Sequence, residues 1–154
     1  MRKLVIMVCF ALTLIGGVML PTVSAQPRIT SGSNIRIMDA YYGDLDGDGY
    51  EDDIKLLVEF SFGNTDPSRV DLNIWIELPS GTTYNFRISV YRPPNESILN
   101  IDCIDMATES GWYTVTMLAS VMGAGNGKLY ITDQLEFDPP TGTGPGLPKV
   151  EAYF

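Results

Sequence analysis

The stretch Ile54–Phe62, IKLLVEFSF, decides the fold class because apolar and polar side chains alternate along it. One set of alternate positions holds Ile54, Leu56, Val58, Phe60 and Phe62. The other set is mostly polar and includes Lys55, Glu59 and Ser61. Because alternate residues of a β-strand point to opposite faces, the pattern predicts a strand with one buried face.

The same period of two continues along the chain. It is clear in VDLNIWIEL (70–78) and YNFRISV (84–90), and weaker in NIRIMDAYY (34–42), ILNIDC (98–103), WYTVTMLASV (112–121) and KLYITDQLEF (128–137). Turn-forming segments such as PSGTT and GAGNG separate these stretches, and none of them has a helical period. About seven short strands joined by short turns predict an all-β protein, an antiparallel sandwich of two sheets.

The segment before Ile54 is strongly acidic. GDLDGDGYEDDI, residues 43–54, carries six carboxylates from Asp44 to Asp53. Unit charges about 4–6 Å apart repel by roughly 1 kcal/mol per pair even in water. One interpretation is a solvated acidic turn, since Asp and Gly are common in turns. The alternation of Asp44, Asp46 and Asp48 before Gly49 favours the other interpretation, a loop that binds a cation.

The spacing D-x-D-x-D-G-x-x-D resembles the first nine positions of an EF-hand calcium loop and the related loops of FG-GAP and dockerin-type repeats. The ligands that this resemblance implies are Asp44, Asp46, Asp48, the backbone carbonyl of Tyr50, and Asp52. Lys55 stands where an EF-hand has its bidentate Glu, so residues 44–55 depart from that family at the end of the loop. Asp53, the second oxygen of Asp52, or water are replacement ligands, and Asp39 is a further candidate. Ca²⁺ fits this oxygen-rich set better than Mg²⁺, which keeps its water.

The order of the predicted strands resembles an immunoglobulin-like domain over about residues 33 to 138. The resemblance rests on LNIWIELPSG as the third strand and SGWYTVTMLAS as the sixth. The chain lacks the cysteine pair of immunoglobulins, and Trp75 falls on the polar face of its strand. Because the acidic loop joins two strands and not two helices, the expected role of the ion is structural.

The N-terminus has the pattern of a secretory signal peptide. MRK supplies positive charge, LVIMVCFALTLIGGVML supplies an apolar core, and Val23 and Ala25 are the small residues before the cut. The prediction is a signal peptide over residues 1–25 and an N-terminal segment over 26–32, with no stable membrane insertion after cleavage. The alternative is an uncleaved anchor, because an apolar run of about 17 residues reaches the lower limit for spanning.

Composition narrows the classes of function. The chain has 19 acidic and 10 basic residues, a net charge of -9 and no histidine. The negative charge argues against a nucleic-acid partner, and the lack of histidine removes the usual general base. Cleavage would leave Cys103 as the only thiol, so no internal disulfide can form and a bound metal becomes a candidate stabiliser. Cys103 lies on an apolar face, which predicts a buried, inert thiol.

Several residues are candidates for binding or modification. Trp75 and Trp112 are candidate binding aromatics that can stack on sugars or anchor a protein, or else simply cover sheet edges. NES at Asn95 is an N-glycosylation sequon. The Pro- and Gly-rich run DPPTGTGPGLP predicts that residues 139–154 are a C-terminal tail beyond a sandwich domain spanning 33–138.

The sequence thus predicts a secreted or cell-surface, non-catalytic module that Ca²⁺ stabilises and that serves adhesion or protein interaction. Its partner, a protein or a glycan, is unknown. The alternatives are an extracellular carbohydrate-binding domain and, third, a small glycan-active hydrolase using a carboxylate pair such as Asp102 and Asp105.

Overall fold

Eight β-strands form the regular structure of the residues that the computed structural model describes, which are 33–123, 128–137, 144 and 146–154. The strands are β1 (Asn34–Gly43), β2 (Asp53–Ser61), β3 (Arg69–Glu77), β4 (Thr83–Tyr91), β5 (Ser97–Ile104), β6 (Tyr113–Met122), β7 (Lys128–Phe137) and β8 (Lys149–Tyr153). The predicted signal peptide (1–25) and N-terminal segment (26–32) lie outside the described residues.

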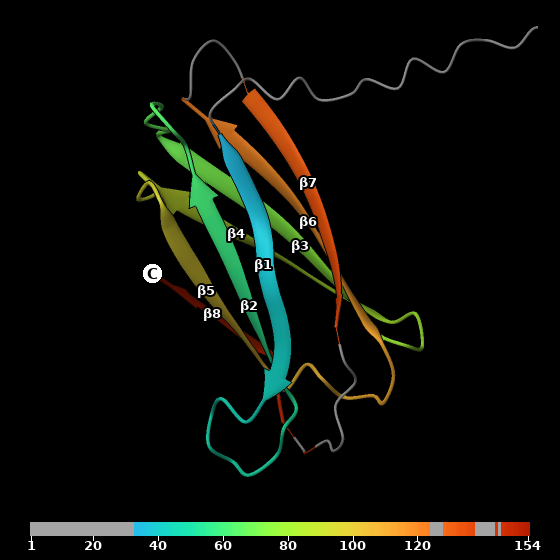
Figure 1. The fold of residues 1–154 in the computed structure, drawn as a ribbon. Coiled ribbons are helices and arrows are strands. Elements are labelled where there is room, and N and C mark those ends of the chain that lie inside the picture. Colours follow the sequence, from blue (N-terminus) through green and yellow to red (C-terminus); the bar gives the residue numbers. More distant parts are fainter. Residues whose placement is uncertain (1–32, 124–127, 138–143, 145) are drawn as a thin grey trace, which may run out of the picture.

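The strands form two four-stranded antiparallel sheets, one in the order β1-β2-β5-β8 and the other in the order β4-β3-β6-β7. Figure 1 shows them as two layers, with β1 and β7 side by side along one flank. The prediction of an all-β, two-sheet antiparallel sandwich is confirmed. The described residues contain no helix, and so none with the length and apolar character of a membrane span.

The core lies between the inner faces of the sheets, and the alternation seen in the sequence builds it. From β2 and the residue after it, Ile54, Leu56, Val58, Phe60 and Phe62 are all fully buried. From β3, the matching set is Val70, Leu72, Ile74 and Ile76, each exposed by at most 1%. Burial of each such side chain contributes about 1.5–3 kcal/mol, which fixes the register because a slip by one residue would turn the apolar set to solvent.

A β-bulge in β1 changes which of its residues face the core. Pairing with β2 shifts between Ile37 and Asp39. Before the shift Ile37 is buried, and after it Ala40 is buried. Met38 and Asp39 therefore both lie exposed. Odd-numbered residues face the core before the bulge, and the even-numbered Ala40 faces it afterwards.

Lys149–Tyr153 form a strand and not part of a tail, which corrects the prediction of a C-terminal tail over residues 139–154 for these five residues. β8 pairs with β5 from Asn100↔Tyr153 to Ile104↔Lys149. On the outer face the Tyr153 hydroxyl accepts a hydrogen bond of 2.6 Å from Lys55 Nζ, and on the inner side the ring of Phe154 packs edge-on to Phe60 at 5.7 Å. KVEAYF is too short to predict a strand by itself, and it forms one because the edge of β5 offers unpaired backbone groups.

A buried carboxylate stabilises the outer face of the second sheet. Asp71 points outward from β3 but is only 1% exposed, because neighbouring side chains cover it. It accepts hydrogen bonds from Arg69 Nε at 2.7 Å, Arg87 Nη2 at 2.6 Å and Ser89 Oγ at 2.6 Å. Burial alone would raise the pKa of Asp71, but these three donors outweigh it and lower the pKa to about 2.

The Asp71 cluster predicts a pH-dependent loss of stability. We expect Asp71→Asn to lower the free energy of unfolding by about 1–3 kcal/mol at neutral pH, because charged donors lose a charged partner. The native pKa lies below the ordinary value, so this stabilisation is complete above about pH 4 and is lost as the pH falls towards 2. Urea unfolding at both ends of this range measures it.

Glu77→Gln is the matched control, since Glu77 is exposed on the same strand. A variant Asp71→Asn that unfolds like the parent at neutral pH, or whose deficit is undiminished near pH 2, contradicts this role of the cluster.

Candidate metal centre

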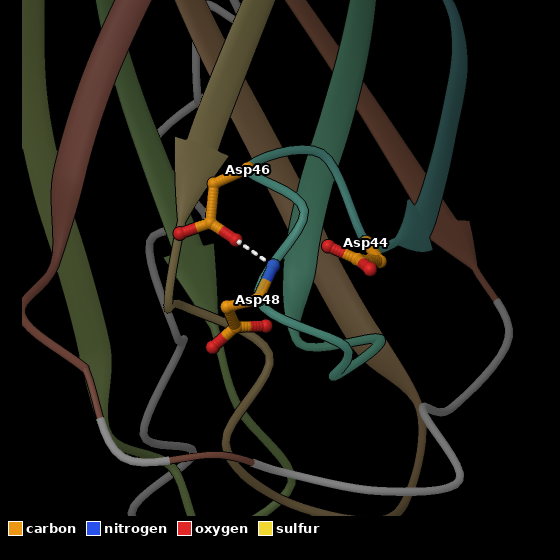
Figure 2. A group of neighbouring side chains, drawn as sticks. All are labelled: Asp44, Asp46 and Asp48. Atoms are coloured by element: carbon orange, nitrogen blue, oxygen red, sulfur yellow. Dashed lines mark hydrogen bonds between the residues drawn. The ribbon is translucent and has the colours of Figure 1, made fainter.

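The acidic segment forms a loop between β1 and β2 in which carboxylates accept hydrogen bonds from the loop's own backbone. Asp44 accepts from Gly47 N at 2.7 Å and from Gly49 N at 3.1 Å. Asp46 Oδ1 accepts from Asp48 N at 3.0 Å, the bond drawn in Figure 2. Gly47 and Gly49 have φ of 82° and 94°, values that L side chains rarely adopt, so the glycines allow the tight turns.

These turns bring three carboxylates together. One oxygen from each of Asp44, Asp46 and Asp48 lies within 4.8 Å of the other two. All three side chains are exposed, and Figure 2 shows Asp44 across the loop from Asp46 and Asp48. Two oxygens bound to the same Ca²⁺ are at most about 5 Å apart, twice the usual bond length, so this spacing fits one shared ion.

A second group of carboxylates shares Asp48 with the first. It consists of Asp48, Asp52 and Asp105, again with ligand oxygens within 4.8 Å of one another. Asp105 follows β5, and its φ of 56° places it in the left-handed region that Asp tolerates better than most residues. Burial raises the pKa of Asp105, and the neighbouring charge of Asp52 raises it further. Asp48 is thus common to both candidate ligand sets.

Asp53 holds the acidic loop and the β5–β6 loop in place. Its side chain is 1% exposed. Oδ2 accepts from Leu45 N at 2.6 Å and Asp46 N at 3.2 Å, and Oδ1 accepts from Asp105 N at 2.8 Å. Nearby, Ala107 N donates to the backbone oxygen of Asp52 at 2.7 Å. Asp53 therefore positions residues of both candidate sets but belongs to neither.

The chain before β8 lies against the same acidic groups. Gly144 N donates to Asp52 Oδ2 at 2.5 Å. A Cβ on Gly144 would approach the Tyr50 ring to 2.5 Å, and one on Gly146 would overlap the Asp105 carboxyl at 1.9 Å. A side chain at either glycine would require these neighbours to shift, so the C-terminal segment contacts both the acidic loop and Asp105.

The structure brings some of the ligands predicted from the sequence together and leaves others outside the candidate sets. It brings Asp44, Asp46, Asp48 and Asp52 into the candidate sets. Tyr50 lies beside them, with its ring exposed and its amide donating to Asp48 Oδ1 at 2.8 Å. Asp39 and Asp53 are outside both sets, Asp39 on the bulge of β1 and Asp53 with its oxygens bonded to backbone amides.

Lys55 and Asp105 explain how the loop departs from the EF-hand spacing. Lys55 Nζ is bonded to Asp102 Oδ1 at 2.5 Å on the outer face of its sheet, and neither residue belongs to either set. Asp105, which the sequence suggested only as one of an acid pair, is the residue that joins the acidic groups from outside the loop. Its position depends on the pairing of β2 with β5, which no local spacing reveals.

The other candidate residues lie apart from the acidic groups. Trp75 is half-buried on the outer face of its sheet, and Trp112 is 62% exposed just before β6. Asn95 is exposed, and its side chain accepts from Phe62 N at 2.6 Å and donates to Gly63 O at 3.0 Å. Cys103 is fully buried, as its parity predicted, and burial raises its pKa to about 12, so the thiol stays protonated at neutral pH.

No protein-family model, curated protein or solved structure matches this chain. Function is therefore inferred from the chemistry of the described residues.

The hydrogen bonds of Asp53 lead to a prediction that distinguishes their effect on the loops from the effect of metal binding. We expect Asp53→Ala to lower the free energy of unfolding by about 1–3 kcal/mol even in the presence of a chelator, because three backbone amides lose their acceptor. Asp44→Ala, which removes an exposed candidate ligand, is the comparison. Chemical unfolding in EDTA measures both, and an Asp53→Ala variant as stable as the parent would show that these bonds do not organise the loops.

Proposed function

We propose that this protein is a secreted or cell-surface module with an immunoglobulin-like sandwich that Ca²⁺ stabilises, and that it serves adhesion or protein interaction without catalysis. The observation that carries the proposal is the pair of carboxylate groups that share Asp48. They collect acidic side chains from the β1–β2 loop and from the residue after β5 at one end of the sandwich.

The donor chemistry supports calcium. Every member of the two groups offers carboxylate oxygen, and the whole chain has no histidine. Hard oxygen donors suit Ca²⁺ and Mg²⁺, whereas zinc and copper favour nitrogen and sulfur. The number of carboxylates favours Ca²⁺, which takes six to eight oxygens and tolerates irregular geometry. Asp105 would then supply the acidic ligand that Lys55 does not.

A structural role for the ion follows from where the carboxylates lie. They come from two loops, and a bound divalent ion would offset their mutual repulsion and hold the loops together. The loop amides already bond to carboxylate oxygens, yet each carboxylate has further lone pairs for a metal. The elements around the carboxylates are paired β-strands, and this rigid arrangement supports a structural role for the ion.

The strand order supports the immunoglobulin-like assignment. In that fold strands A, B and E are neighbours in one sheet and C, F and G in the other. Here β1-β2-β5 and β3-β6-β7 have the same sequence of neighbours. β4 lies beside β3, and β8 takes the edge beside β5.

The absence of catalysis is supported by the state of the nucleophile and base candidates. Cys103 is a buried, protonated thiol, and the chain offers no imidazole to act as a base. Asp102, one half of the acid pair considered for glycan hydrolysis, is bonded to Lys55 and to the Tyr153 hydroxyl. Secretion is supported by the N-terminal sequence pattern alone.

Thermal melting with EDTA and with excess Ca²⁺ tests the proposal. At a calcium concentration of 100 times Kd, we expect the ion to add about 2.7 kcal/mol to the free energy of unfolding. That gain corresponds to a rise in Tm of roughly 10 °C for a domain of this size. Mg²⁺ at the same concentration should raise Tm less.

Asp48→Asn is the decisive variant, because Asp48 belongs to both groups and Asn keeps an oxygen that can accept from the Tyr50 amide. It should lose most of the calcium-dependent rise. Asp66→Asn, an exposed site between β2 and β3, should keep the full rise. A parent protein whose Tm ignores calcium, or an Asp48→Asn variant with an unchanged rise, would refute the calcium proposal.

A further inference from the structure

Figure 1 shows β1 and β7, the edge strands of the two sheets, side by side along one flank. A pocket lies on this flank. The lining residues that carry chemistry are Asp39, Tyr41, Tyr42, Trp112 and Glu136. None of these residues belongs to the two carboxylate groups of the metal centre. The pocket is therefore a separate feature of the surface.

Four aromatic side chains line the pocket, and two of them are largely open to solvent, whereas Phe137 is buried. Trp112 is 62% exposed and Tyr41 is 44% exposed, while Tyr42 is half-buried against the core. The bulge of β1 helps to place two of these rings. After it, Tyr42 lies on the same face of the strand as buried Ala40, and Tyr41 lies on the same face as exposed Asp39. Such rings present faces of negative potential to whatever enters.

The charge of the pocket has one sign. Its described lining contains two carboxylates and neither Lys nor Arg. The Asp39 carboxylate accepts a hydrogen bond only from the adjacent Ala40 N, at 2.9 Å to Oδ1. The Glu136 carboxylate forms no hydrogen bond or ion pair with any described residue. Both carboxylates can therefore accept further hydrogen bonds or pair with a cation. The net charge of the whole chain is -9.

We propose that this pocket binds a cationic side chain, lysine or arginine, of a basic peptide segment in a protein partner. Charge complementarity selects the occupant, because two uncompensated carboxylates attract a cation and disfavour a neutral or acidic group. The aromatic faces add cation–π attraction, which is strongest for tryptophan, and an arginine guanidinium can stack on a ring while it donates to a carboxylate. This assigns a contact surface to the chain that does not depend on the metal centre.

The test uses a short peptide with three arginines separated by glycines and a matched peptide with neutral citrulline at each arginine position. Binding to the purified protein is measured by calorimetry at physiological ionic strength, once with calcium and once with EDTA. The arginine peptide should bind in both conditions, and the citrulline peptide should bind much more weakly. Binding retained in EDTA separates this proposal from the metal proposal.

Variants locate the contact. Trp112→Ala and Glu136→Gln should each weaken binding of the arginine peptide by about fivefold, through loss of the cation–π contact and of one charge. Trp75→Ala and Glu77→Gln remove the same kinds of group from the outer face of the second sheet and should leave affinity unchanged. Both pocket changes affect exposed side chains, and unchanged thermal melting confirms that each variant is folded.

Two results would overturn the proposal. One is that the arginine peptide binds both pocket variants as tightly as the parent, which would indicate general attraction to an acidic surface. The other is no binding of the arginine peptide while a neutral hexasaccharide binds and loses affinity in Trp112→Ala, which would make the pocket a glycan site.

Discussion

One buried carboxylate holds together the end of the sandwich on which the proposed metal site depends. Asp53, at the start of β2, accepts hydrogen bonds from the amides of Leu45, Asp46 and Asp105. A carboxylate that is 1% exposed requires such donors, since a buried charge without hydrogen bonds is costly. Because the amides belong to two loops far apart in the sequence, the same bonds that satisfy Asp53 set the separation of those loops.

The C-terminal segment reinforces this end of the molecule. β8 extends the sheet beyond β5, and the residues that lead into it contact Asp52 and Asp105 through glycine. The β1 bulge, by contrast, shapes the flank, where it leaves Asp39 exposed beside the aromatic pocket. The sandwich thus keeps a regular core, and its candidate sites lie at the acidic loop and beside the β1 bulge.

Local sequence patterns predicted the features that depend on local spacing. The alternation in residues 54–62 and 70–78 indicated the strands and their buried faces, because the period of two is a property of the strand itself. The spacing of Asp44, Asp46 and Asp48 likewise indicated that these side chains converge, since alternate residues of a tight loop can point inward. Both kinds of pattern extend over about ten residues.

Features that depend on pairing between distant strands were not predictable in this way. Asp105 reaches the acidic loop only because β5 pairs with β2, and β8 exists only because β5 has an open edge. Asp53 was predicted as a replacement ligand because Lys55 stands where an EF-hand has its glutamate, and the sequence does not reveal that the oxygens of Asp53 accept hydrogen bonds from backbone amides. The alternation in residues 70–78 indicates that Asp71 points outward, but it does not reveal that two arginines and a serine bury it.

Calorimetric titration of Ca²⁺ into the parent protein and into Asp105→Asn would show whether one ion links carboxylates from two loops. Removing a charged ligand lowers calcium affinity, so we expect the Kd for calcium of Asp105→Asn to rise by about tenfold or more. The Kd of Asp66→Asn should equal that of the parent. Equal affinity of Asp105→Asn and the parent, or no heat of binding in the parent, would contradict such a link.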